Sequence, residues 1–177
     1  MTDIKTLDDL MPHGLDLVFV GINPPEYSAQ RRHYYSHPRN RFWRWLTDST
    51  LVDREVGPED DEVLPERDGI GFTDVVKRVE TDSRNVTPAE LRAAAPGFRR
   101  RVADASPRAV CFNGKKAFEA VFPREWTPGA WGRHDVPLAG AMVWVMPSSS
   151  GSAGGSHKHA PGVLRDIARA LGRDARR

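Results

Sequence analysis

Three short segments, far apart in the chain, carry side chains suited to hydrolysis without a metal ion. Gly21-Ile22-Asn23-Pro24 supplies an amide, Gly71-Phe72-Thr73-Asp74 a carboxylate, and Met146-Pro147-Ser148-Ser149-Ser150 a turn rich in hydroxyls. Each segment follows an apolar run that is typical of a buried strand. Because ligands bind outside the carboxyl ends of the strands in open α/β sheets, we expect the three segments to line one cleft.

Asn23 is suited to holding a water molecule. An asparagine amide is not a proton-accepting base near neutral pH, but its carbonyl oxygen can orient water where a strand ends. On local grounds alone, Asn23-Pro24 equally fits a simple turn after a strand. Pro25, which follows, fixes φ and removes one N–H donor from this loop.

Asp74 can accept a proton from water, which Asn23 cannot do. Such a role works best with a modestly raised pKa, and partial burial in a pocket produces that shift. The alternative roles for Asp74 are structural, namely a helix cap or an ion pair with Lys77 or Arg78.

The strands that would position these side chains are visible as apolar runs at 15–20, 109–112 and 141–146. Their continuous apolar character is typical of strands in a parallel sheet that is covered on both faces. We therefore expect the chain to place them side by side at the centre of the fold.

Helices alternate with these runs. Thr87-Pro88-Ala89-Glu90 is a capping box with proline at the first helical position, and it predicts a crossover helix that Pro96 could kink. Further helices are expected over 40–46, 115–122 and 163–171. This alternation predicts an α/β fold with right-handed crossovers.

The remaining stretches are expected to be connections. Residues 53–67 are acidic and contain prolines, and residues 123–137 separate two predicted elements, so both are expected on the surface. Residues 148–159 have the composition of the most flexible segment of the chain, and a Ser/Gly loop of this kind is most often a linker.

Length and charge bound the possible functions. The 177 residues suit one domain spanning 1–177, and a net charge of +2 means that binding to nucleic acid would depend on clustered charge. Such clusters occur, although each could equally be a solvated face. They are Arg31-Arg32 with Arg39, Arg41 and Arg44, then Arg99-Arg100-Arg101, and then Arg173 with Arg176 and Arg177; acidic residues gather at Glu59-Asp60-Asp61-Glu62.

Cysteine and histidine usage argues against a metal or a redox centre. The single cysteine, Cys111, lies in an apolar run and is expected to be a small core residue. His157-Lys158-His159 has i, i+2 spacing in a Gly/Ser-rich loop and lacks a further ligand motif nearby. We therefore expect no metal site and no cofactor.

The sequence also shows no membrane-directing feature. Its first residues lack the basic and apolar regions of a signal peptide, and no apolar stretch approaches the ~20 residues of a membrane span. We expect a cytoplasmic, monomeric protein without membrane contact.

The motifs as a set resemble those of the mismatch-specific uracil/thymine-DNA glycosylase family. The resemblance is carried by Gly21-Ile22-Asn23-Pro24, by Tyr34-Tyr35-Ser36-His37-Pro38-Arg39-Asn40-Arg41-Phe42-Trp43 and by Met146-Pro147-Ser148-Ser149-Ser150-Gly151. It extends over about 15–169. It implies a three-layer α/β/α sandwich with a short, mainly parallel central sheet, the uracil-DNA glycosylase fold.

The resemblance assigns roles around the base. Asn23 stands at the family's catalytic asparagine, and Tyr35 matches the aromatic residue that stacks on the flipped base, although a tyrosine here could also just cover the core. Backbone groups near Ile22 and Tyr35, together with the Asn40 side chain, are expected to read the pyrimidine edge.

The resemblance also implies contacts to the DNA backbone. Phe112-Asn113-Gly114-Lys115 resembles the family's third strand and following helix, and it places Lys115 to meet a phosphate. Ser148, Ser149, Ser150 and Gly151 match a wedge loop that pinches phosphates beside the extruded nucleotide. Ser152 departs from the family, which has a bulky side chain at this position to fill the gap in the duplex.

The implied function is monofunctional removal of uracil from double-stranded DNA, especially opposite guanine, in a protein that associates with the nucleoid through DNA. No amine nucleophile is placed for strand scission. Two alternatives remain. A non-catalytic damaged-DNA-binding module would need neither Asn23 nor Asp74, and a nucleotide-binding α/β protein would need a glycine-rich first turn, which this chain lacks.

Overall fold

The computed structural model describes residues 4–151 and 154–175, and its centre is a five-stranded sheet in the order β2-β1-β3-β5-β4. Four strands are parallel and short β4 is antiparallel to β5. The strands are β1 (Leu17–Gly21), β2 (Ile70–Asp74), β3 (Ala109–Asn113), β4 (Gly132–His134) and β5 (Met142–Met146).

Each face of the sheet carries its own apolar cluster. In β1, Leu17 and Phe19 belong to one cluster, whereas Val18 and Val20 belong to the other. Successive strand residues point to opposite faces, so both faces of this strand are buried. The continuous apolar run in the sequence reflects this double burial.

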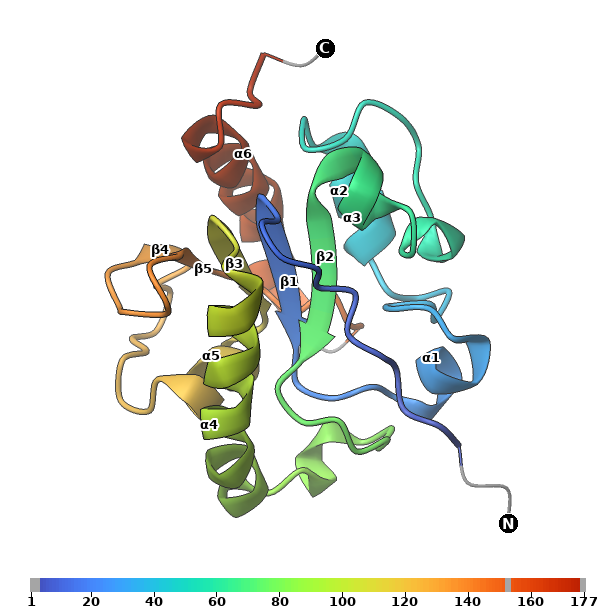
Figure 1. Ribbon diagram of the computed structural model, residues 1–177, viewed down its shortest axis with the longest axis vertical. Helices are drawn as coiled ribbons and strands as arrows, with labels where there is room; N and C mark the ends of the chain where they lie inside the picture. The colour runs from blue at the N-terminus through green and yellow to red at the C-terminus, as the bar shows by residue number, and fades with distance from the viewer. Residues whose placement is uncertain (1–3, 152–153, 176–177) are drawn as a thin grey trace.

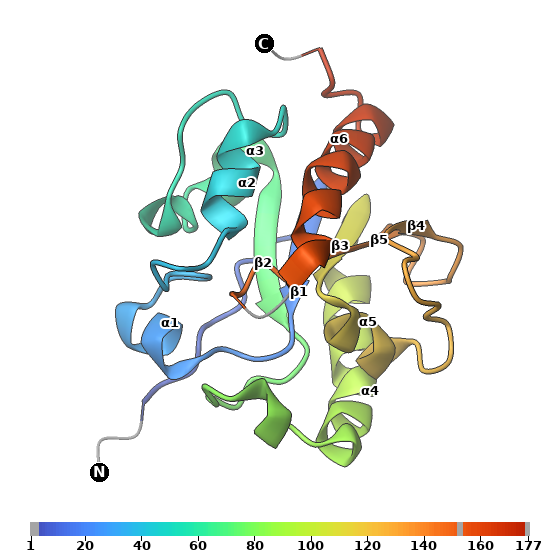
Figure 2. The same cartoon turned by 180° about the vertical axis from the view of Figure 1, so that it is seen from behind.

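Helices cover both faces. Figures 1 and 2 show α4 and α5 on one face, and α2, α3 and α6 on the other. The helices are α1 (Glu26–Arg31), α2 (Phe42–Asp48), α3 (Leu64–Asp68), α4 (Pro88–Ala105), α5 (Lys115–Val121) and α6 (Ala160–Ala170). Short 3-10 turns span Pro58–Asp60, Ser83–Asn85 and Gly154–His159. The predicted three-layer α/β/α sandwich is confirmed.

The side-chain cap predicted for the start of the crossover helix is present at Thr87. The Thr87 hydroxyl accepts a hydrogen bond from the Glu90 N–H at 3.1 Å, and Pro88 opens α4. Pro96 lies inside this helix, which begins at Pro88 and ends at Ala105. Phe98 and Val102, one turn apart, are buried against the sheet.

Two expected surface connections differ from the sequence interpretation. The stretch 123–137 contains β4, whose three residues are too few and too polar to show strand periodicity. The stretch 53–67 includes the fully buried Asp61 and Leu64. Tertiary packing therefore buries part of a segment that its acidic composition assigns to the surface.

The open edge of β2 is covered by the N-terminal segment. Leu10 pairs with Phe72 in an antiparallel bridge, with hydrogen bonds of 2.9 Å in both directions. Covering an edge in this way removes unpaired backbone groups from the surface. In the part of the chain that the structure describes, no helix is both long and apolar enough to cross a membrane.

The bridge at Leu10 makes Gly71 a sensitive position. A Cβ at Gly71 would lie 2.2 Å from the Leu10 carbonyl oxygen and 2.4 Å from Leu15 Cδ1, which is too close for either atom. We expect Gly71→Ala to lower the free energy of unfolding by roughly 1–3 kcal/mol in urea titrations. Gly162→Ala in α6, where a Cβ meets nothing within 4 Å, should instead raise it by roughly 0.5–1 kcal/mol. Equal effects at the two positions would contradict this account.

Candidate active site

The carboxyl ends of the four parallel strands open into a cleft of about 600 Å³. Asn23 follows β1, Asp74 ends β2, Asn113 ends β3, and Ser148 and Ser150 follow β5; all five line the cleft. The structure therefore brings together the three predicted segments. It adds a fourth, at Asn113, which the sequence interpretation quoted in a motif without assigning it a role.

Asn23 is held by its amide nitrogen. This nitrogen donates to the main-chain carbonyls of Glu80 at 2.7 Å, Pro24 at 3.2 Å and Arg78 at 3.3 Å. The side chain is only 8% exposed, and no hydrogen bond from a described residue reaches its Oδ1. Three carbonyls thus fix the donor side of the amide and leave its oxygen as the free acceptor.

Asp74 lies across the end of the neighbouring strand. Gly21 is its register partner in β1, and a Cβ at Gly21 would lie 2.4 Å from Asp74 Oδ1. Only glycine leaves this space for the carboxyl group. The side chain is 2% exposed, and its Oδ2 has no hydrogen-bond partner among the described residues.

The environment of Asp74 favours its protonated form. Burial raises the pKa of Asp74 to about 7, Asp9 adds to the increase, and Lys77 and Arg101 oppose it. The alternative structural role, an ion pair with Lys77 or Arg78, is not seen, because Lys77 pairs with Asp9 at 2.8 Å and Arg78 pairs with Glu90. Asp74 is therefore a carboxyl group that changes charge near neutral pH.

Arg101 belongs to the framework behind Asp74. Its guanidinium donates to the Asp74 main-chain carbonyl at 2.6 Å and pairs with Asp9 at 2.9 Å. Neighbouring Arg99 donates to the Val121 carbonyl at 2.7 Å. Two of the three arginines at 99–101 are thus engaged in the fold and do not form an exposed basic cluster.

Tyr35 forms one wall of the cleft. Its ring lies 4.4 Å from that of Phe42, and its backbone is left-handed, with φ of 52°. Burial raises the pKa of its hydroxyl, which lies near the Asn113 amide without completing a hydrogen bond to it. Asn40 also lines the cleft, and its Oδ1 accepts from the Phe42 N–H at 3.0 Å in the turn just before α2.

Asn113, at the end of β3, holds the serine turn (residues 148–150) by two hydrogen bonds. The Asn113 amide donates to Ser149 Oγ at 2.8 Å, and the Ser149 N–H donates to Asn113 Oδ1 at 2.9 Å. Ser149 is 1% exposed, so its hydroxyl serves the turn. The hydroxyls of Ser148 and Ser150 lie 2.9 Å apart beside the cleft.

His157 holds the same turn from the other side. Its Nε2 lies 3.1 Å from both the Ser148 and the Ser150 carbonyl oxygens, and its ring packs against Trp45 at 5.5 Å. The described part of the serine turn is therefore held by Asn113 and the Arg41 N–H from elsewhere in the fold and by His157 from its own segment.

The other predicted residues lie around this centre. Ile22 lines the cleft, and its carbonyl accepts from the Val76 N–H at 2.8 Å. Lys115 is the first residue of α5 and is exposed, outside the cleft lining. Gly151 is exposed at the end of the serine turn, and Ser152 lies outside the described residues.

One wall was not anticipated from the sequence. The loop after β2 supplies the lining residues Glu80, Thr81, Asp82, Ser83 and Arg84. It returns to the site because the Glu80 N–H donates to the Pro24 carbonyl at 3.1 Å. A larger, open cleft of about 1140 Å³ lies near the amino ends of the strands, and none of the predicted site residues lines it.

Comparison with known proteins identifies the family. The sequence pattern of the Uracil DNA glycosylase superfamily matches residues 8–172, nearly the whole chain. The chain belongs to this superfamily. The matched range contains every described residue that lines the cleft except Leu7, which lies just before the range begins.

A solved structure shares the fold of this superfamily member. It is a solution NMR structure of a candidate uracil DNA glycosylase from Methanosarcina acetivorans, with a TM-score of 0.54 and 20% sequence identity. The similarity covers 93% of this chain and 98% of that one. At this identity the likeness establishes the architecture, and the arrangement of the site rests on the contacts described above.

Burial of Asp74 has a consequence for stability. In the unfolded chain its pKa is near the ordinary 3.8, against about 7 when folded, so the folded state binds the proton more tightly. Asp74 therefore costs no stability below about pH 4, and its cost grows as the pH rises towards 7. We expect Asp74→Asn to be more stable than wild type by on the order of 3 kcal/mol at pH 8, with the difference vanishing near pH 4. Urea titrations across this range test it, and a difference independent of pH would refute the raised pKa.

Proposed function

We propose that this superfamily member is a monofunctional DNA glycosylase that hydrolyses the N-glycosidic bond of uracil in double-stranded DNA, especially opposite guanine. The observation that carries the proposal is the pairing of Asn23 and Asp74. An amide oxygen and a carboxyl group from adjacent parallel strands line one cleft, beside the aromatic ring of Tyr35.

In the proposed reaction, the bond between the base nitrogen and C1′ of the sugar breaks as a water oxygen bonds to C1′. Positive charge develops on the sugar and negative charge on the departing base. The Asn23 oxygen, fixed by the three carbonyls on its amide nitrogen, orients the water. The Asp74 carboxylate accepts the proton that the water releases.

The raised pKa of Asp74 suits this task. At a pKa of about 7, a substantial fraction of the carboxyl group is ionised at neutral pH, and the ionised form is a stronger base than an ordinary aspartate. Its Oδ2 is buried and has no hydrogen-bond partner among the described residues, so no donor stabilises the charged form at this oxygen. The burial that costs stability is thus the feature that supports proton transfer.

Base recognition is assigned to Tyr35, Asn40 and Ile22. The Tyr35 ring rests on Phe42 and is available to stack on an extruded base, which contributes ~1–3 kcal/mol in nucleic-acid sites. Since the Asn40 Oδ1 accepts from the Phe42 N–H, the NH2 group of Asn40 remains to donate to a pyrimidine carbonyl. Backbone groups near Ile22 and Tyr35 complete the contacts to the base edge.

Contacts to the DNA backbone are assigned to the rim. Ser148 and Ser150 face the cleft, and the Arg41 N–H donates to the Ser149 carbonyl at 2.9 Å, which places the start of α2 beside the serine turn. The exposed side chains of Arg39 and Arg41 form no ion pair with another described residue. With exposed Lys115, they offer positive charge for phosphates, and the modest net charge makes this local cluster the basis of binding.

A monofunctional reaction is proposed because no lysine occurs among the described residues that line the cleft. Strand scission through a Schiff base would require such an amine. Preference for uracil opposite guanine follows from the lower cost of extruding a base from a mismatch. The competing hypothesis is a damaged-DNA-binding module without catalysis. Such a module would need neither the fixed amide of Asn23 nor the buried carboxyl group of Asp74.

The primary test is release of base from matched duplexes carrying U·G, U·A and T·G pairs and from single-stranded uracil DNA. We expect wild type to release uracil, fastest from U·G, and Asn23→Ala to bind duplex with nearly unchanged affinity while its single-turnover rate falls by at least ~100-fold. The loss follows from removal of the amide oxygen that positions the water; the substitution also removes the hydrogen bonds from the amide nitrogen to three main-chain carbonyls but changes no proposed phosphate contact. An Asn23→Ala rate within about threefold of wild type would overturn the assignment. Duplex binding without any base release by wild type would favour the damage-binding module.

A second test addresses proton acceptance by Asp74. The wild-type single-turnover rate should rise with pH and level off above about pH 7, because the ionised carboxyl group is the active form. Asp74→Asn cannot accept the proton, so its rate should be lower and its profile flat across this range. Unchanged rate and profile in Asp74→Asn would return the residue to a purely structural role.

A further inference from the structure

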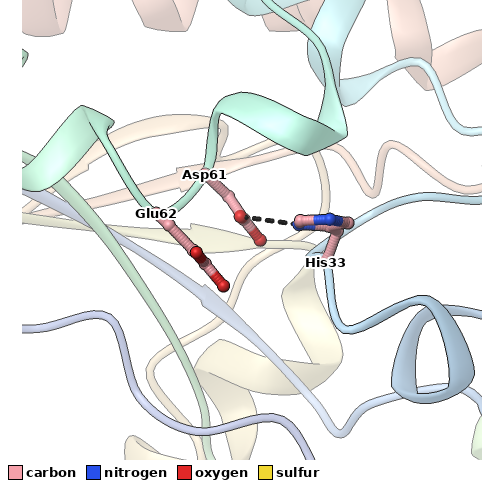
Figure 3. A group of neighbouring side chains, drawn as sticks. All are labelled: His33, Asp61 and Glu62. Atoms are coloured by element: carbon pink, nitrogen blue, oxygen red, sulfur yellow. Dashed lines mark hydrogen bonds and ion pairs between the residues drawn. The ribbon is translucent and has the colours of Figure 1, made fainter.

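Asp61 is a buried carboxylate that grips the segment leading to Tyr35. It is 0% exposed, its Oδ1 lies 2.9 Å from His33 Nδ1, and its Oδ2 accepts from the Tyr34 N–H at 2.8 Å. Figure 3 shows the His33 ring and the Asp61 side chain directed toward one another. The residue comes from the acidic run at 59–62, which the sequence alone assigns to the surface.

Burial of the Asp61 carboxylate costs desolvation free energy, and its contacts with His33 and the Tyr34 N–H offset this cost. Desolvation raises the pKa of Asp61, and the hydrogen bonds from His33 and from the Tyr34 backbone oppose the shift. A buried carboxyl group that has lost these donors would be strongly destabilised. The two contacts of Asp61 are therefore firm constraints on the backbone that carries them.

The gripped segment is strained. Arg32 and Tyr35, which flank His33 and Tyr34, both have left-handed backbones, with φ of 63° and 52°. Such a conformation costs an L-residue roughly 1–2 kcal/mol and persists only where the surroundings over-determine it. The Trp43 indole N–H also holds this backbone by donating to the Tyr34 carbonyl at 3.0 Å, and the Arg32 and His33 N–H groups donate to carbonyls of α1 at 3.3 Å.

A metal site is the alternative for these side chains. One donor atom from each of His33, Asp61 and Glu62 lies within 4.8 Å of the other two. Both Asp61 oxygens, however, already contact protein donors, and Glu62 is an exposed side chain. A cation would have to displace the hydrogen bonds that hold the strained segment, so the observations favour a structural clamp.

We propose that Asp61 is a positioning residue that holds the Tyr35 ring against the cleft in the orientation needed to stack on the extruded base. The inference rests on the proposed function for its catalytic consequence. Its structural part, that Asp61 fixes the strained backbone of residues 32–35, is independent of any activity.

The structural part is tested on the free protein by hydrogen exchange. Asp61→Ala should accelerate exchange of the Tyr34 and Tyr35 amides by at least ~10-fold while leaving the amides of β1 and β3 unchanged. Glu62→Gln, a charge change at the exposed neighbour, is the matched control and should leave all of these rates unchanged. Unchanged exchange at Tyr34 in Asp61→Ala would overturn the clamp, whether or not the protein releases uracil. If Asp61→Ala does not fold, Asp61→Asn is measured with the same criteria.

The catalytic part is tested by a double-mutant cycle on uracil release. If Asp61 acts through Tyr35, Asp61→Ala should lower the single-turnover rate about tenfold in the wild-type background and leave the affinity for undamaged duplex unchanged. In the Tyr35→Ala background the same substitution should have no further effect. Equal losses in both backgrounds would show a general structural role and overturn the proposal. Absence of uracil release by wild type would instead count against the proposed function.

Discussion

The organising feature of this molecule is a carboxyl group that is buried without a full set of partners. Asp74 ends β2, fills the space left by Gly21, and keeps one oxygen free of hydrogen bonds from the described residues. Proteins rarely retain such a group, because desolvation disfavours its charge. Here the cost yields a residue that titrates near neutral pH, in a cleft that also presents a free amide oxygen.

The parallel sheet is what makes this arrangement possible. Four neighbouring strands end at the same level, so residues at or just after each strand end reach the same cleft. Asn113, at the end of β3, does not face the reaction directly in our proposal. It holds the serine turn through two hydrogen bonds to Ser149 and thereby couples the position of this turn to the sheet.

The loops of the site are rigid for reasons that lie outside the loops. The carbonyls of Glu80 and Arg78 orient Asn23, His157 bridges the Ser148 and Ser150 carbonyls, and Asp61 grips the backbone before Tyr35. The contacts of Asn23 and of Asp61 join residues distant in sequence, whereas those of His157 lie within its own segment. Together they hold polar groups in place before any ligand arrives, which is the condition under which fixed dipoles stabilise a developing charge most effectively.

The sequence by itself determined the α/β architecture, the capped helix α4 and the convergence of Asn23, Asp74 and the serine turn. These follow from local information: apolar runs, a capping box and the rule that parallel strands end on one side of the sheet. The strand-exit rule could also have indicated Asn113. Only the tertiary structure decided that Asp74 lacks an ion pair, that Asp61 is buried and that His157 orders the serine turn. Those properties depend on partners brought near by folding, and burial and pairing of a charge are set by such neighbours rather than by adjacent residues.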